Sequence, residues 1–143
     1  MMLSINNDND LEKVEVVLHC AATVRFDEDL SRALNMNVGA VSSLIALCKK
    51  MQRLCSFVHV STAYCHCQRQ HIEEISYPPP IPPRQALSLL CGLDNKVLDD
   101  KNFTKMLIGD RPNTYTYTKV ILSIQFTYST SGSYFRRLLK ISS

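Results

Sequence analysis

Tyr115 and Lys119 are the residues whose types and spacing point most directly to chemistry. If this segment is helical, two side chains four residues apart lie on the same helix face. A cation beside a phenol favours the ionised phenol, so Lys119 is expected to lower the pKa of Tyr115 from about 10 towards neutral pH. Such a tyrosine can donate a proton to a carbonyl oxygen. The alternative is a tyrosine that stacks on a lysine stem on a solvated helix face.

Two hydroxyl side chains, Ser61 and Thr62, follow a β-branched run at residues 56–60 that is typical of a buried strand. Ligands of open parallel sheets bind at the carboxyl ends of the strands. A hydroxyl there can hydrogen-bond a substrate carbonyl and stabilise the oxyanion that develops on it. The alternative is a hydroxyl that only closes a turn after the strand. The tyrosine–lysine pair further along the chain favours the functional interpretation.

A second strand is expected at residues 14–19, followed by the small residues Ala21 and Ala22, which allow a ligand or a helix to approach closely. Between the strands, apolar residues recur at spacings of three and four and predict a helix: Leu30, Leu34, Val38, Val41, Leu44, Ile45 and Cys48. Strand, helix and strand of this length predict a βαβ unit with parallel strands. Asn37 is a poor helix former and is expected to bond locally or to bend the helix.

Four blocks of this sequence resemble a eukaryotic fatty acyl-CoA reductase in their order and spacing. The blocks are HCAATVRF at 19–26, VHVSTAYC at 58–65, YPPP at 77–80 and GDRPNTYTYTK at 109–119. These enzymes are extended short-chain dehydrogenase/reductases, and the proline block and the GDRPNTY run narrow the resemblance to this family. The implied fold class is α/β, with a partial Rossmann-like parallel sheet flanked by helices.

The resemblance implies catalytic roles for four side chains. Tyr115 resembles the general acid, and Lys119 resembles the residue that lowers the pKa of that tyrosine. Thr62, with Ser61 as its rival, resembles the hydroxyl that orients the substrate carbonyl. The implied reaction is a two-step reduction of a long-chain fatty acyl-CoA to a primary fatty alcohol, which consumes two NADPH and releases CoA.

The resemblance also implies part of a binding site for NADPH. Tyr115 and Lys119 would lie at the nicotinamide ribose, which the lysine holds, and Asn37 would steady this lysine through water. Ala21 and Ala22 would form the wall beside the cofactor. NADPH rather than NADH is implied by the family alone. The implied location is intracellular, on the cytosolic side of the peroxisomal or endoplasmic reticulum membrane.

The sequence departs from the family at both ends. The family opens with a strand and a glycine-rich turn that cradles the dinucleotide pyrophosphate, whereas none of the four glycines here fits that motif. Residues 1–13 are expected to be disordered or unrelated to the family. Residues 120–143 are interpreted as an atypical tail from a read-through or a mis-spliced exon, because β-branched, aromatic and serine residues disfavour the expected helix. Residues 14–119 would then be the central piece of a reductase domain, inactive by itself.

Composition narrows the class of protein further. The 143 residues suffice for one domain, and 45% hydrophobic and 20% charged residues are typical of a chain with a packed core. A net charge of +3 is too small to indicate nucleic-acid binding. No uncharged stretch has the ~18 apolar residues that a membrane span needs. Membrane association is therefore not expected from this segment, and for the full-length enzyme it stays open.

Six cysteines raise the alternatives of disulfides or zinc. No secretory signal opens the chain, so reduced thiols are expected. Cys65, His66 and Cys67, with His59 and His71 nearby, could mimic a metal cluster. The Cys-x-Cys spacing and the lack of a second pair argue against zinc, so no metal is predicted.

Five of the six prolines lie in residues 77–83, which are expected to form an ordered surface loop rather than a ligand for an SH3-type domain. Two short helices are expected next, at residues 84–93 and 96–107. In the resembled family such an insertion shapes the acyl side of the cleft. The alternative is that these helices only cover the sheet.

Two rival functions stay open at this point. Another extended short-chain dehydrogenase/reductase, acting on a sugar nucleotide or a steroid, would share the tyrosine–lysine pair. A catalytically inactive truncated product with at most a binding role would follow from the missing glycine-rich turn. Without the family's first strands, the sheet would have an unpaired edge and an uncovered face, which predicts poor solubility.

Overall fold

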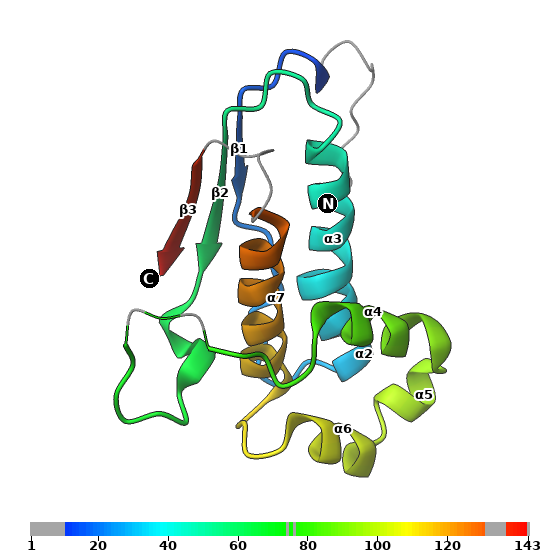
Figure 1. Ribbon diagram of the computed structural model, residues 1–143. Helices are drawn as coiled ribbons and strands as arrows, with labels where there is room; N and C mark the ends of the chain where they lie inside the picture. The colour runs from blue at the N-terminus through cyan, green and yellow to red at the C-terminus, as the bar shows by residue number, and fades with distance from the viewer. Residues whose placement is uncertain (1–10, 74, 76, 131–136, 143) are drawn as a thin grey trace.

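A three-stranded parallel sheet lies against a layer of helices in the computed structural model, which describes residues 11–73, 75, 77–130 and 137–142 (Figure 1). The strands, in sheet order, are β1 (Val16–His19), β2 (Ser56–Ser61) and β3 (Arg137–Ser142). The α/β class and the parallel pairing of the two expected strands are confirmed. Residues 1–13 were expected to be disordered or unrelated to the family, and the first ten of them lie outside the described residues.

The predicted helix between the first two strands is present in three consecutive parts. These are α2 (Leu30–Leu34), a π-helical turn η1 (Asn35–Gly39) and α3 (Ala40–Cys48). The π turn includes Asn37, where the sequence predicted a local bond or a bend. Such turns widen a helix by one residue and are frequent at functional sites.

The chain after β2 turns at once into a 3₁₀ helix, η2 (Ala63–His66), and then runs through the proline-rich segment. Tyr77 is buried in this segment, and its hydroxyl accepts a hydrogen bond of 2.9 Å from the backbone N–H of Glu73. The Arg69 guanidinium lies 4.0 Å from the centre of the Tyr77 ring. These contacts order the loop that the sequence predicted here.

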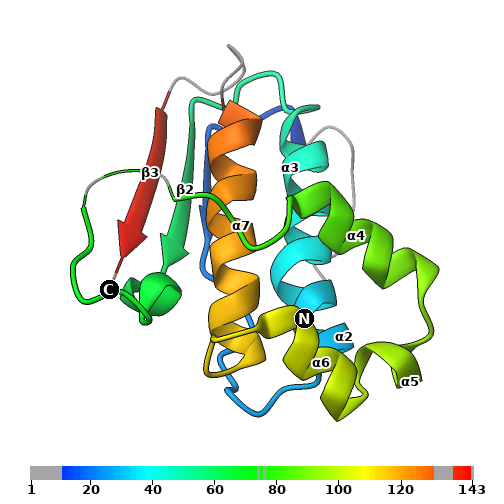
Figure 2. The same ribbon diagram turned by 60° about the horizontal axis from the view of Figure 1, so that its bottom comes forward.

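Three helices, rather than the expected two, follow the prolines: α4 (Pro83–Gly92), α5 (Asn95–Leu98) and α6 (Lys101–Ile108) (Figure 2). The prediction of one continuous helix at 96–107 is wrong because two aspartates interrupt it. The Asp100 carboxylate accepts the backbone N–H groups of Asn102 and Phe103 and so starts a new helix. The Asp99 carboxylate instead accepts two hydrogen bonds from Ser31.

The last helix, α7, runs without a break from Thr114 to Thr130. The prediction that the helix would stop after Lys119 is therefore wrong. Val120, Ile121 and Leu122 are fully buried, and their packing outweighs the low helix propensity of the β-branched pair. The strand β3, which follows in the segment interpreted as an atypical tail, was not predicted.

Helices α7 and α3 lie side by side against one face of the sheet (Figures 1 and 2). One apolar cluster joins the sheet to these helices through Phe57, Val41 and Leu122. A second cluster joins α2, α4 and α7 through Leu34, Ala86 and other side chains. Since each buried leucine or phenylalanine contributes roughly 1.5–3 kcal/mol, these clusters fix where α7 stands relative to the sheet.

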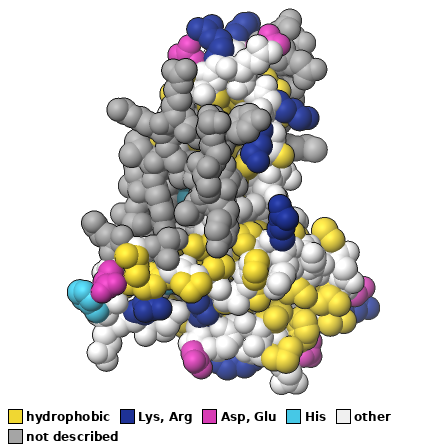
Figure 3. Space-filling model, in the orientation of Figure 1, with side chains coloured by type: hydrophobic (Ala, Val, Ile, Leu, Met, Phe, Trp, Pro, Cys, Tyr) yellow, Lys and Arg dark blue, Asp and Glu magenta, His cyan; other side chains and the backbone are white. Residues whose placement is uncertain are grey.

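Large apolar side chains also reach the surface. On the face of β1 that the helices do not cover, Val16 and Leu18 are 54% and 71% exposed. On the side shown in Figure 3, apolar side chains gather over the region of α4 to α6, where Val97 and Met106 are exposed. The uncovered sheet face that the sequence predicted is therefore present in this chain.

Candidate active site at the carboxyl end of the sheet

The first two turns of α7 bring Tyr115 and Lys119 onto one face. The Asn113 side chain caps this helix by accepting the N–H of Thr116 at 2.9 Å, and the Thr114 hydroxyl ties the first turn to the Glu28 carbonyl at 2.8 Å. The Lys119 ammonium lies 5.7 Å from the centre of the Tyr115 ring, within reach of a cation–π contact. Both side chains are buried, so the alternative of a solvated helix face is wrong.

Lys119 is an unusual cation because it is only 4% exposed. Burial lowers its pKa, and the nearby Cys65 thiol opposes this shift only in part. Within the described residues, its ammonium makes no hydrogen bond or ion pair. A buried ammonium with free donors fits a ligand that offers hydroxyl oxygens, such as a ribose.

The two hydroxyl residues lie where β2 ends. The Ser61 hydroxyl is 3.9 Å from the Cys65 sulfur. The Thr62 hydroxyl accepts the N–H of Tyr64 at 3.2 Å and so caps η2, which packs against α7. The turn-closing alternative is therefore present at Thr62, although its hydroxyl hydrogen remains available as a donor. Which of the two hydroxyls orients the substrate carbonyl stays a prediction.

The chain after β1 forms the other side of this edge. Ala21 is exposed and Ala22 is half-buried, so small side chains face the surface directly after the strand. Phe26 packs edge-on against Tyr115 with ring centres 5.3 Å apart. Sequence reasoning missed this contact, because the HCAATVRF block shows an aromatic residue but not which ring it meets.

Asn37 connects three elements of the site. Its side-chain oxygen accepts the backbone N–H of Thr23 at 3.1 Å, and its amide nitrogen donates to the Thr118 hydroxyl at 2.9 Å. The asparagine is fully buried, and Thr118 directly precedes Lys119. It therefore holds the loop after β1 against α7, while its predicted link to the lysine through water stays a prediction.

Two histidines also belong to this edge and were not predicted as site residues. His19 ends β1, and His59 lies beside it on β2 with their Nδ1 atoms 2.9 Å apart. Burial, followed by the charge of Lys119, lowers the pKa of His19. The sequence signal was the alternation of His59 with valines, which indicated only a satisfied strand residue.

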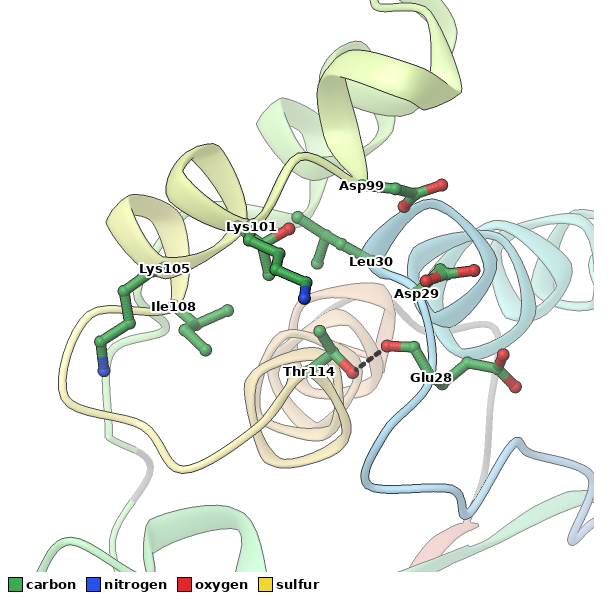
Figure 4. A pocket seen from close by; sticks show the side chains of 9 residues that line it. Glu28, Asp29, Leu30, Asp99, Lys101, Lys105, Ile108 and Thr114 are labelled. Atoms are coloured by element: carbon green, nitrogen blue, oxygen red, sulfur yellow. Dashed lines mark hydrogen bonds between the residues drawn. The ribbon is translucent and has the colours of Figure 1, made fainter.

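A pocket of about 260 Å³ opens between α6 and the start of α2 (Figure 4). Thr114, the residue before Tyr115, lies at its wall and bonds to Glu28. Lys101 points into the pocket from α6, whereas the Lys105 ammonium turns away and donates to the Gly109 carbonyl at 3.2 Å. Asp29 and Asp99 contribute carboxylates to the lining. The charges of this pocket are mixed, so it shows no preference for an anion.

A larger hollow of about 580 Å³ lies between α3, α4 and α7 and is lined by Ser42, Lys49, Pro82, Pro83, Arg84, Leu87 and Gln125. Neither this hollow nor the smaller pocket is lined by the predicted site residues. Both pockets are therefore separate from the edge that carries the tyrosine and the lysine.

A metal cluster, a disulfide and a membrane-spanning helix are three further features that the described part of the chain could carry. No cluster of three or more metal-binding side chains is found there. All six cysteines lie among the described residues and are free thiols. No helix among the described residues is long and apolar enough to cross a bilayer.

Comparison of the fold finds a similar solved structure that was determined with a dinucleotide bound. The UDP-glucuronic acid 4-epimerase of Bacillus cereus, determined in complex with NAD, superposes with a TM-score of 0.60 over 96% of this chain and 36% of the epimerase. The sequence identity is 17%, so the likeness concerns the fold alone. It confirms the Rossmann-like architecture.

Comparison of the sequence identifies the family. Residues 3–122 match the NAD-binding family described as male sterility protein. The chain is 47% identical over 116 residues to fatty acyl-CoA reductase 1 of Xenopus laevis and 43% identical over 111 residues to fatty acyl-CoA reductase 2 of Mus musculus. These matches cover 81% and 78% of this chain but only 22% and 21% of the relatives. The chain belongs to the male sterility protein family, an enzyme family in which its relatives are fatty acyl-CoA reductases.

Proposed function

We propose that this chain forms the central part of the active site of an NADPH-dependent reductase that converts long-chain fatty acyl-CoA to primary fatty alcohol. The observation that carries the proposal is the buried pair on α7: Lys119, without a polar partner among the described residues, beside Tyr115. The similarity to fatty acyl-CoA reductases supports the choice of substrate. The chain spans about a fifth of the length of those relatives.

The residues present fit the nicotinamide end of the cofactor. The buried donors of Lys119 suit the ribose hydroxyls, and the exposed Ala21 leaves room beside the strand. The cofactor, when bound, supplies the hydride for each of the two reductions. A glycine-rich cradle for the pyrophosphate does not occur in this sequence, so that end of the cofactor has no matching residues here.

The chemistry left to this chain is proton transfer and carbonyl orientation. Tyr115 donates a proton to the carbonyl oxygen as its carbon is reduced, and the positive charge of Lys119 favours the tyrosinate that remains. The hydroxyl of Thr62 or Ser61 orients the same oxygen and stabilises its developing charge. Loss of CoA from the first tetrahedral product gives an aldehyde, and a second reduction of the same kind gives the alcohol.

The cellular location that we propose for the full-length enzyme follows from its family. The longer enzyme would act inside the cell, on the cytosolic side of the peroxisomal or endoplasmic reticulum membrane. Fractionation of cells that express the tagged full-length protein tests this location. Recovery of the protein in the secreted fraction would contradict it.

Isothermal titration of the purified 143-residue chain with NADPH tests the proposal that this chain holds only the nicotinamide end of the cofactor. We expect no binding in the micromolar range, because Lys119 and the loop after β1 hold only one end of the dinucleotide. A full-length reductase that includes this segment should bind NADPH under the same conditions and serves as the positive control. Micromolar binding by the 143-residue chain would show that a complete dinucleotide site exists within it.

A further inference from the structure

Phe26 lies against the proposed proton donor, yet most of its side chain is open to solvent. The centre of its ring is 5.3 Å from that of Tyr115, and the two ring planes meet edge-on at 64°. Phe26 is 61% exposed, whereas Tyr115 is only 7% exposed. Edge-to-face contact is a favoured arrangement of aromatic rings, so this contact holds one side of Phe26 and leaves the rest as apolar surface. A molecule that reaches the Tyr115 hydroxyl therefore enters beside an apolar side chain.

The loop that carries Phe26 is held in place on both sides of this residue. Before it, the backbone N–H of Thr23 donates to the Asn37 side chain at 3.1 Å, and the Thr23 hydroxyl donates to the Glu28 carboxylate at 3.0 Å. After it, the Glu28 carbonyl accepts the hydroxyl of Thr114, the first residue of α7, at 2.8 Å (Figure 4). Because these buried bonds tie the loop to η1 and α7, the backbone of Phe26 keeps a fixed place relative to the tyrosine.

The two charged neighbours of Phe26 are paired with each other. The Arg25 guanidinium donates to both carboxylate oxygens of Asp27, at 3.1 and 3.0 Å. A bidentate pair of this kind leaves neither charge without a partner. Val24, two residues before Phe26, is also apolar and is 68% exposed. The side chains that this part of the loop offers to a ligand are therefore apolar rather than charged.

We propose that Phe26 is a specificity-determining residue that contacts the first carbons of the substrate's acyl chain, an inference that rests on the reductase site proposed above. For proton transfer, the carbonyl oxygen must come within about 2.6–3.2 Å of the Tyr115 hydroxyl. The two groups bonded to the carbonyl carbon then lie close to the tyrosine. One is the alkyl chain, and the other is the sulfur that leads to the polar CoA. The apolar ring of Phe26 matches the alkyl chain, because both surfaces leave water when they meet.

This contact predicts a preference for straight acyl chains. A linear chain can lie along the ring of Phe26, whereas a methyl branch on the carbon next to the carbonyl adds bulk where the ring stands. One methylene more or less in an apolar pocket changes kcat/KM by about 10–200-fold. Phe26→Ala removes the ring and should admit the branched chain. Such a gain cannot result from a loss of folding.

The first test measures binding without chemistry, in a full-length reductase that includes this segment. The probes are S-dodecyl-CoA and S-(2-methyldodecyl)-CoA, two thioethers that have no carbonyl and cannot be reduced. By calorimetry, we expect the wild type to bind the linear probe about tenfold more tightly or better, and Phe26→Ala to bring the two affinities within about threefold. Phe26→Tyr keeps the ring and should keep the preference. Met106→Ala, which removes an apolar side chain that is 69% exposed on α6, is the matched control and should also keep it.

Two outcomes of the binding test would overturn the inference. One is an affinity ratio that is the same in Phe26→Ala and in the wild type. The other is a wild type that binds both probes equally or binds neither of them. A clear preference in an enzyme that does not reduce acyl-CoA would instead support the contact and contradict the proposed reductase function, so the two failures are distinguishable.

The second test assigns the contact to the acyl chain rather than to CoA. Dodecanal and 2-methyldodecanal contain no CoA, and their reduction by the same enzyme with NADPH isolates the second step. We expect the ratio of their kcat/KM values, linear over branched, to fall by about tenfold or more in Phe26→Ala. If Phe26 only supports the ring of Tyr115, the substitution lowers kcat equally for both aldehydes and leaves the ratio unchanged. That result would contradict the proposal while the reductase function stands.

Discussion

At the scale of single residues, the site depends on an ammonium that the fold buries at a cost. The pKa of Lys119 is lower in the folded chain than in the unfolded chain, where it is near 10.5, because burial disfavours the charge. Between these two values the unfolded chain binds more protons, so stability increases with pH across that interval. Below the folded pKa the whole cost is present. Lysines with a pKa lowered by burial are frequent at functional sites, which supports the role proposed for Lys119.

Lys119→Met tests this cost through stability. We expect the variant to unfold a few degrees higher than the wild type at pH 7, because a buried charge is replaced by an apolar chain of similar length. The difference should shrink as the pH approaches 10.5, where the wild-type lysine loses its proton in both states. Thermal unfolding followed by circular dichroism at pH 7 and pH 10 measures both effects. Lys101→Met is the control, and a destabilised Lys119→Met at pH 7 would refute the argument.

At the scale of elements, the site is held where a π turn, a strand end and a helix start meet. The sequence predicted the strands and the long helical region because their apolar periodicities are strong. It did not predict that α7 continues past Lys119, since local propensity carries no information about Val120 and Ile121 packing into the core. The sequence also did not predict that the helix expected at 96–107 is interrupted at Asp99. Its carboxylate bonds to Ser31, which is 68 positions away in the chain.

The site itself was predictable only in part. Tyr115 and Lys119 belong to one helix, so their spacing alone indicates a shared face. The histidine pair and the contact of Phe26 with Tyr115 join residues from different elements, and no local pattern reports such contacts. Asn37 was partly predictable. Its low helix propensity indicated a special position, but its hydrogen-bond partners are known only from the fold.

Asn37→Ala tests the connection between η1, α7 and the loop after β1. The substitution leaves the buried N–H of Thr23 without its acceptor, which should cost about 1–3 kcal/mol of unfolding free energy. Asn35→Ala, in the same π turn but exposed, is the matched control and should change stability by less than about 0.5 kcal/mol. Urea unfolding of the two variants gives the comparison. Equal effects would mean that the bonds of Asn37 do not hold these elements together.

At the scale of the whole molecule, the helices cover one face of the sheet, while the other face exposes Val16 and Leu18. Each apolar side chain left in water forgoes roughly 1.5–3 kcal/mol of burial. A parallel sheet in an α/β protein normally has both faces covered. The chain therefore has a surface that favours association with another apolar surface.

Leu18→Lys should change the state of the isolated chain in solution. We expect the wild type to form dimers or larger species at micromolar concentration and the variant to sediment as a monomer, because the charge prevents burial of this sheet face. Met106→Lys replaces an equally exposed apolar residue on α6 and should leave association unchanged. Sedimentation velocity distinguishes these outcomes. A monomeric wild type would show that the uncovered face does not drive association.

The central claim is that Tyr115 and Lys119 form the proton-transfer site of an acyl-CoA reductase. The most direct measurement inserts this chain's 116-residue matching segment into the Xenopus laevis fatty acyl-CoA reductase 1, which is 47% identical over that length. Conversion of palmitoyl-CoA to alcohol with NADPH is then followed by product analysis. The chimera should be active, and Tyr115→Phe should lower kcat by about 10²–10⁴-fold. Tyr117→Phe, which removes a buried hydroxyl without a hydrogen-bond partner among the described residues, should remain active. Normal turnover by Tyr115→Phe, or a chimera that binds NADPH but forms no alcohol, would contradict the account.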